Sequence, residues 1–127
     1  MTKRVLNVGQ CVPDHGAITR FLQSAFDVQV EKVDSAVDTL DRLRKQPYDL
    51  VLINRKLDAD YSNGTDILRS IKADPQLAAV PVMIITNYQE HQENAIALGA
   101  VYGFGKQELG SSDVIARLEP ILKNPAG

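Results

Sequence analysis

The chain has 127 residues, of which 44% are hydrophobic, and its 14 basic and 16 acidic side chains give a formal net charge of −2. This composition is typical of one globular domain with its own core, and it disfavours disorder or a nucleic-acid-binding surface. No apolar run approaches the roughly 20 residues that cross a bilayer. The start MTKRVLNVG shows no signal peptide and there is one cysteine, so we expect a cytoplasmic protein that binds neither nucleic acid nor membrane.

Short apolar runs alternate with helical patterns in the first half of the chain. The run 5–8 predicts a strand, and the apolar residues after it recur at helical spacing (Ile18, Phe21, Leu22 and Ala25). A second strand is predicted over 28–33, followed by a helix that Asp34 or Ser35 caps. LVLI at 50–53 is apolar at every position, which predicts a strand covered on both faces.

The second half continues the alternation: a helix to about Ala73, a strand over 80–85, a weaker helix over 89–98, a short strand over 101–104 and a last helix capped by Ser111 or Ser112. Five strands alternating with five helices predict an α/β fold, a doubly wound parallel sheet with helices on both faces. One domain is predicted over 3–123, with 124–127 as a tail or the start of a linker.

In such sheets, ligands and chemistry gather beyond the carboxyl ends of the strands. The segments that fall there are 9–13, Asp34, 54–63, 86–88 and 105–107. They contain polar residues that end apolar strands, above all Asn54 after LVLI and Thr86 after the strand 80–85. The sequence therefore places a candidate site at this edge of the sheet.

Several stretches together resemble the receiver domain of two-component response regulators over nearly the whole chain. They are "VDSAVDTLDRLRKQPYDLVLI", "PYDLVLIN", "DILRSIKADPQLAAVPVMIIT" and "ALGAVYGFGK". The resemblance implies a flavodoxin-like fold with strand order 2-1-3-4-5. It also implies a function in a phosphorelay pathway, as a signalling domain and not as an enzyme.

Residue by residue, the resemblance implies a degenerate receiver. The acidic pair that holds a divalent cation falls on Gly9 and Gln10, and the phosphoacceptor aspartate falls on Asn54. Thr86 and Lys106 match the retained threonine and lysine, whereas the switch aromatic falls on Gly103. The loop 54–64 is also about two residues longer than usual, and we expect its segment 61–64 to be mobile or to form an extra turn.

The chemistry of these losses is consistent. An acyl phosphate requires a carboxylate nucleophile, which the Asn54 amide cannot replace. Mg²⁺ prefers carboxylate oxygen, and the four positions Gly9, Gln10, Asn54 and Lys106 carry a net charge of +1 where the family has a negative charge. We therefore expect no cofactor, no Mg²⁺ binding and no phosphorylation at Asn54. We expect Lys106, without its acidic partners, to be partly solvated or bonded to backbone carbonyls.

Purely structural roles for these residues, and other functions of the domain, remain open. Asn54 alone could be a strand-ending loop residue, Cys11 a structural thiol, and Arg55 and Lys56 a solvated surface. The interpretation we favour is a pseudo-receiver that binds a signalling protein, or a second copy, through the face of its fourth helix, fifth strand and fifth helix. One alternative is an anion or small-ligand sensor in which Arg55 and Lys56 contact the ligand. Another is a receiver phosphorylated at Asp58 or Asp60.

Overall fold

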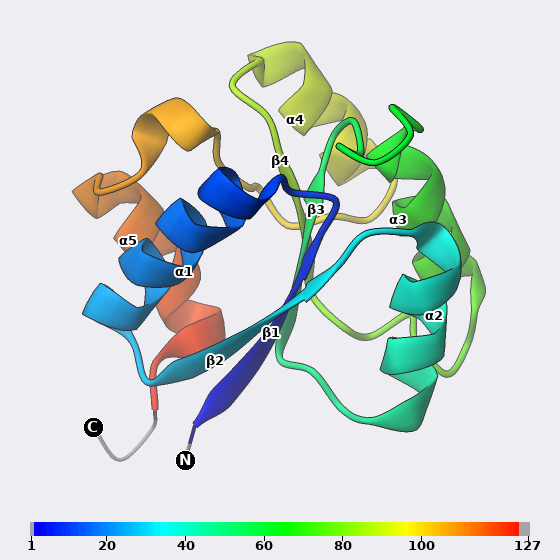
Figure 1. The fold of residues 1–127 in the computed structure, drawn as a ribbon, viewed down its shortest axis with the longest axis horizontal. Helices are drawn as coiled ribbons and strands as arrows, with labels where there is room; N and C mark the ends of the chain where they lie inside the picture. The colour runs from blue at the N-terminus through cyan, green and yellow to red at the C-terminus, as the bar shows by residue number, and fades with distance from the viewer. Residues whose placement is uncertain (1, 125–127) are drawn as a thin grey trace.

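The computed structural model describes residues 2–124, and the predicted tail or linker 124–127 lies outside them except for Asn124. The strands are β1 (Lys3–Val8), β2 (Val28–Val33), β3 (Leu50–Asn54) and β4 (Val82–Ile85); the helices are α1 (Val12–Ala25), α2 (Ala36–Lys45), α3 (Gly64–Ala73), α4 (Gln89–Ala97) and α5 (Ser112–Leu122), with a short 3-10 turn η1 (Lys106–Glu108). The five predicted helices are confirmed (Figure 1). Within residues 2–124, none of the helices is long and apolar enough to cross a membrane.

The strands form one parallel sheet in the order β2-β1-β3-β4, with α1 and α5 on one face and α2, α3 and α4 on the other (Figure 1). β3 and β4 are buried on both faces, because all their side chains except that of Asn54 are covered by a helix layer. Two apolar clusters result, one on each face. The first includes Leu6, Ile53, Ile67 and Ala95, and the second includes Val5, Leu52, Ile18 and Leu118.

The predicted fifth strand is not formed, so the order 2-1-3-4-5 is corrected to four strands among residues 2–124. The segment 101–104 still runs beside β4, where Val101 N–H donates to the Val82 carbonyl at 2.8 Å and Thr86 N–H to the Phe104 carbonyl at 3.1 Å. Between these two bonds the Gln92 side chain lies where the ladder would continue, and it takes the Gly103 N–H. A side chain thus replaces part of the expected backbone pairing.

Polar side chains cap the beginnings of α2, α3 and α5. The hydroxyls of Ser35 and Ser111 and the Asn63 amide oxygen each accept a backbone N–H at the first turn of α2, α5 and α3. Such caps satisfy N–H groups that have no partner inside the helix. They confirm two of the predicted helix starts and add Asn63, which ends the loop after β3.

The long loop after β3 forms its own turn, one of the two outcomes expected from its sequence. Lys56 and Asn63 pair as an antiparallel bridge. Leu57 N–H donates to the Ser62 carbonyl at 2.9 Å, and Tyr61 N–H donates to the Leu57 carbonyl at 2.8 Å. Leu57 is buried beneath the turn. The loop is therefore anchored at its base and presents its tip to solvent.

Candidate functional site

Five of the predicted site residues line one pocket of about 200 Å³ at the carboxyl edge of the sheet. They are Asn54, Arg55, Lys56, Thr86 and Lys106, and Ile85, Asn87 and Tyr88 complete the lining. The pocket forms there because parallel strands end side by side: Asn54 is the last residue of β3, and Thr86 follows β4. Gly9 and Gln10, after β1, are not among the lining residues.

The Asn54 side chain is half-buried and is tied to the loop after β1. Its Nδ2 group donates a hydrogen bond of 3.2 Å to the Gly9 carbonyl. The Asp58 N–H donates to the same carbonyl at 2.9 Å. An amide can make the first contact, whereas an ionised carboxylate only accepts hydrogen bonds and cannot. The amide at position 54 therefore helps to join the loops that follow β1 and β3.

Gly9 leaves no room for a side chain. Its φ of 77° lies in the left-handed region that residues with a Cβ rarely adopt. A Cβ atom at this position would lie 2.3 Å from Leu57 Cδ2, and Leu57 is only 1% exposed. An acidic side chain at position 9 would therefore require the buried leucine to move. The next residue, Gln10, is fully buried, and neither polar atom of its amide has a hydrogen-bond partner among residues 2–124.

Lys106 is partly solvated, as expected, but it does have an acidic partner, which was not expected. Its Nζ lies 2.7 Å from Oδ2 of Asp14, in the first turn of α1. The hydrogen bond from Lys106 lowers the pKa of Asp14 below its usual value. The side chains are 30% and 41% exposed, so solvent screens the pair and it contributes at most about 1 kcal/mol. Lys106 is thus oriented by α1, from outside the pocket.

The pocket is electropositive. Three of its lining residues are cationic and none is acidic. Lys106 is paired with Asp14, but Arg55 and Lys56 form no ion pair with any residue of 2–124. Two uncompensated cations beside a hydroxyl group attract anions and repel a divalent cation.

The sequence also matches the family model described as "Response regulator receiver domain", over residues 11–118. The chain belongs to the response regulator receiver family. As a receiver domain it is a module of two-component signalling, and its α/β fold with five helices is the flavodoxin-like fold of that family.

Solved structures agree with this fold. A sensor protein from Polaromonas sp. is similar at 16% identity with a TM-score of 0.79, with 94% of each chain covered. The receiver domain of a DNA-binding response regulator from Colwellia psychrerythraea is 21% identical, with a TM-score of 0.76, 93% of this chain and 96% of the other being covered. The receiver domain of a sensor histidine kinase from Pseudomonas aeruginosa is 22% identical, with a TM-score of 0.69 and coverage of 97% and 96%.

The last of these relatives has a magnesium ion in its active-site cleft, so we asked whether the residues of this receiver fit one. Mg²⁺ is held through carboxylate oxygens and water in octahedral geometry. Within residues 2–124 no three His, Cys, Asp or Glu side chains cluster in a way that could hold a metal. Asn54 turns its amide nitrogen to Gly9, and Gly9 has no side chain. The donor set does not fit the ion.

Asp58 and Asp60, the acids nearest to Asn54 in the loop, lie apart from the pocket. Both are exposed, and neither is among the residues that line the pocket with Lys106. Asp60 Oδ1 accepts the Ser62 N–H at 2.9 Å, and hydrogen bonds from Ser62 lower its pKa. Asp60 thus stabilises its own turn.

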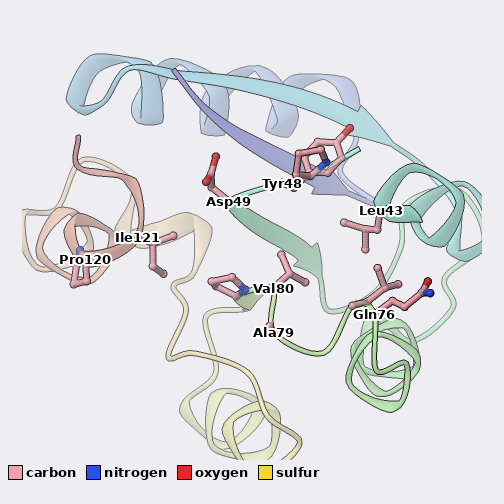
Figure 2. A pocket seen from close by; sticks show the side chains of 11 residues that line it. Leu43, Tyr48, Asp49, Gln76, Ala79, Val80, Pro120 and Ile121 are labelled. Carbon is pink, nitrogen blue, oxygen red and sulfur yellow. The ribbon is translucent and has the colours of Figure 1, made fainter. Parts of the chain in front are cut away.

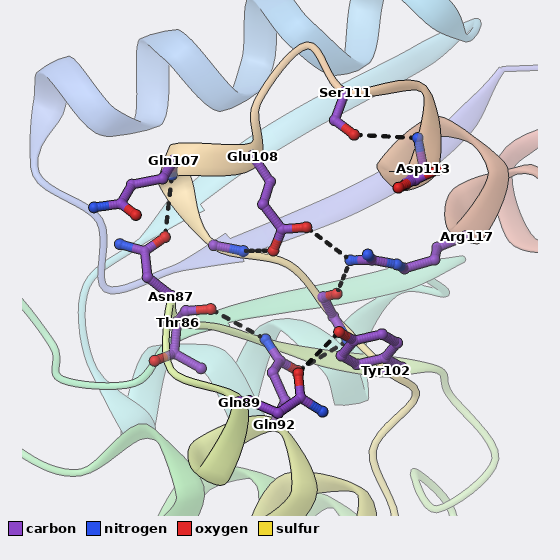
Figure 3. A network of polar contacts seen from close by, with 12 residues as sticks. Thr86, Asn87, Gln89, Gln92, Tyr102, Gln107, Glu108, Ser111, Asp113 and Arg117 are labelled. Carbon is purple, nitrogen blue, oxygen red and sulfur yellow. Dashed lines mark hydrogen bonds and ion pairs between the residues drawn. The ribbon is translucent and has the colours of Figure 1, made fainter.

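A polar network beside the pocket holds α4 and the segment 101–105 (Figure 3). Gln92, on α4, is 3% exposed. Its Nε2 donates to the carbonyls of Ile84 at 2.9 Å and Thr86 at 3.3 Å, and its Oε1 accepts the Gly103 N–H at 3.0 Å. All the bonding groups of this buried amide are therefore used except one lone pair of the oxygen. Gln92 connects α4 to both β4 and the segment that replaces the fifth strand.

Arg117, on α5, completes the network from the other side. Its guanidinium donates to the Gly103 carbonyl at 2.8 Å and to Glu108 at 3.2 Å. It also lies 4.4 Å from the centre of the Tyr102 ring, and the Tyr102 hydroxyl donates to Gln89 on α4 at 3.0 Å. The three elements of the expected interaction face are thus connected by side chains (Figure 3).

The sequence pointed to neither Asp14 nor Gln92. Asp14 is an acid in the first turn of a helix, where a favourable helix dipole already explains it, and it lies 92 residues from Lys106 along the chain. Gln92 left a weaker signal, because the helix 89–97 has few apolar residues and its buried positions are Gln92 and Ala95. A glutamine on the buried face of a helix requires partners, which could have been sought among the strand carbonyls.

Proposed function

We propose that this receiver domain is a protein interaction module of a phosphorelay pathway that does not accept a phosphoryl group at position 54. In this proposal it is a degenerate receiver, not an enzyme, with no resident cofactor and no bound Mg²⁺. Its location is the cytoplasm, and neither nucleic acid nor a membrane is its partner. The cytoplasmic location rests on the sequence alone.

The hydrogen bond from Asn54 to the Gly9 carbonyl carries the proposal. An aspartate at position 54 would put a carboxylate against that carbonyl, which would repel it, and the buried carbonyl would lose a donor. Two further features support the proposal: Lys106 is engaged by Asp14, and Leu57 fills the space that an acid at position 9 would need. The charge and the packing of the site favour the same outcome.

Intact mass spectrometry tests the chemistry directly. After incubation with Mg²⁺ and acetyl phosphate the protein should keep its unmodified mass, while a receiver that has the aspartate, treated in parallel, gains a phosphoryl group. An adduct on any aspartate contradicts the proposal, and its position at Asp58 or Asp60 would support phosphorylation at a non-standard residue. The melting temperature should also be equal in millimolar Mg²⁺ and in chelator, because a ligand of the folded state would raise it.

We place the partner on the face of α4, segment 101–105 and α5. Ile96, Val101 and Tyr102 are exposed there by 45%, 39% and 37%. Gln92 and Arg117 join the three elements, which favours a face held in one conformation. The partner is a signalling protein, or a second copy of the chain. Light scattering tests the homodimer, and Tyr102→Ser should dissociate a dimer that uses this face.

A second candidate function, anion sensing, is favoured by the electropositive pocket. Arg55, Lys56 and Lys106 line it together with the Thr86 hydroxyl, and oxyanions are bound by such charged donors. The ligand would compete with Asp14 for Lys106. This candidate requires no metal and no covalent step.

A phosphate titration followed by amide NMR, at constant ionic strength, distinguishes the two functions. Under anion sensing, phosphate shifts the amides of Arg55 and Thr86 at millimolar concentration or below, and Arg55→Gln weakens the binding. Asp14→Asn should strengthen it by freeing Lys106, whereas Arg20→Gln on the exposed side of α1 is the control. Shifts that Arg20→Gln reduces as much as Arg55→Gln would indicate only nonspecific attraction.

A further inference from the structure

A second pocket, of about 540 Å³, lies at the amino edge of the sheet, away from Asn54 (Figure 2). Leu43 and Tyr48 form the wall near α2, Val80 belongs to the loop before β4, and Pro120 and Ile121 come from the last turns of α5. Pro47 and Pro81 also line it, so that with Pro120 three of the eleven lining residues have no backbone N–H to offer. The chemistry proposed for the carboxyl edge uses none of these residues.

The part of the pocket wall near Val80 is held in place by a lysine of α3. Lys72 Nζ, on α3, donates to the carbonyls of Ala78 at 2.9 Å and Val80 at 2.8 Å. Burial lowers the pKa of this lysine, in keeping with an ammonium group enclosed by the loop it bonds. The loop before β4 is therefore tied to α3, and the pocket is formed before anything binds.

Asp49 is the one charged residue in the pocket lining. Its backbone N–H donates to the Arg4 carbonyl at 2.8 Å, and its Oδ2 accepts the Arg4 N–H at 2.8 Å. The first bond fixes the backbone and the second fixes the carboxylate, just before the start of β3. Asp49 forms no ion pair with any residue of 2–124, and its Oδ1 has no hydrogen-bond donor among them. One oxygen of a half-buried anion thus remains available.

These features define a ligand. Small-molecule pockets typically enclose about 300–1,000 Å³ and have apolar walls with few polar groups that orient the ligand. The lining also holds Gln76, which is exposed, and Tyr48, whose hydroxyl already bonds Gln46 and Glu31. The remaining wall is apolar, and with one fixed carboxylate it is complementary to an apolar body with one cationic N–H donor and repels anions. We propose that this pocket binds a small apolar amine, with the ammonium group on Asp49 and the apolar body between Val80 and Ile121.

Binding there would have a structural effect at a distance from the carboxyl edge. The ligand would contact α5 through Pro120 and Ile121 and the α2–β3 connection through Pro47 and Tyr48. It would thus connect two parts of the chain that lie on opposite faces of the sheet. The end of α5 would be held more firmly when the pocket is filled.

Three probes with the same ring test the proposal: benzylamine, benzyl alcohol and benzoate, each titrated into the labelled protein and followed by amide NMR. Benzylamine should shift the amides of Leu43, Val80 and Ile121. Benzyl alcohol should bind about tenfold more weakly, the size of one charge-assisted contact, and benzoate should not bind. Shifts confined to other surfaces, or equal binding of amine and alcohol, would overturn the proposal.

Two variants and a control sharpen the test. Asp49→Asn keeps an oxygen for the Arg4 N–H but removes the charge, so it should abolish the preference for the amine. Ala79→Trp, at an exposed position of the lining, should block all probes while urea unfolding shows that the fold is retained. Asp58→Asn, at the other edge of the sheet, should change nothing. If benzylamine binds Asp49→Asn as tightly as the unmodified protein, Asp49 does not recognise the amine.

Discussion

The two outer sides of the sheet, at β2 and at β4, are held by different kinds of bond. At the β2 edge, six consecutive residues of β1 pair with six of β2, from Lys3↔Val28 to Val8↔Val33. At the β4 edge one isolated bridge, Ile85↔Phe104, stands in place of a ladder, and the side chains of Gln92 and Arg117 hold the segment 101–105. Backbone pairing tolerates many side chains, whereas side-chain bonds depend on particular residues. The second edge should therefore be far more sensitive to substitution.

Gly103→Ala should have the largest effect. A Cβ atom there would lie 2.5 Å from the Ile84 carbonyl oxygen and 3.2 Å from Gln92 Oε1, so the segment must move away from β4. We expect the free energy of unfolding in urea to fall by about 3 kcal/mol.

Gly16→Ala is the matched control for that change. On α1 the new Cβ meets only the flexible end of Arg20, at 3.2 Å, and alanine favours a helix over glycine by up to about 1 kcal/mol. The control should be neutral or stabilising. If both variants lose the same free energy of unfolding, the segment beside β4 does not specifically require glycine at position 103.

Gln92→Leu should cost about 2 kcal/mol, because it leaves the buried Gly103 N–H without its acceptor and the Ile84 carbonyl without its side-chain donor. Hydrogen exchange of the Gly103 amide should also become faster. Asn94→Leu on the exposed side of the same helix is the control, with an expected change within about 0.5 kcal/mol. An unchanged exchange rate at Gly103 would show that Gln92 does not hold the segment.

Arg117→Gln should cost about 1 kcal/mol. It removes the charged hydrogen bond to the Gly103 carbonyl and the contact with the Tyr102 ring. Amide shifts should be confined to the segment 101–105, Glu108, the start of α4 and the neighbours of position 117 on α5. If the variant is as stable as the unmodified protein, Gln92 alone holds the segment 101–105 beside β4.

Gln29→Ala, at an exposed position of β2, should have the smallest effect, within about 0.5 kcal/mol. The backbone of β2 pairs with β1 whatever this side chain is. A loss larger than about 1 kcal/mol would remove the contrast between the two edges.

The sequence predicted the strands and helices, whose apolar residues recur at regular spacing. It did not predict contacts between residues that are distant along the chain. The alternation of apolar runs placed four strands and five helices, and the strand ends placed Asn54, Thr86 and Lys106 at one edge. The segment 101–104 has the apolar and aromatic residues of a strand, and what interrupts it is an amide on α4 that no strand pattern could indicate. Local preference was overridden there by one tertiary contact.

The site shows the same limit. The uncharged residues Gly9, Gln10 and Asn54 at the strand ends are visible in the sequence, and so is the positive charge of Arg55 and Lys56. The Asn54 bond to Gly9 and the Asp14 partner of Lys106 depend on how the loops after the strands meet. These loops are joined by specific side chains, and their mutual geometry has no periodic signal in the chain.

The contact between Gly9 and Leu57 also bears on how such a site changes over generations. A chain with this contact is not one substitution away from a chain with an acid at position 9. The acid would first meet Leu57 Cδ2 on a left-handed backbone, and shortening the leucine first would leave a buried hole that costs about 2–5 kcal/mol. The packing therefore couples positions 9 and 57, so that the residue at each position limits what the other can be.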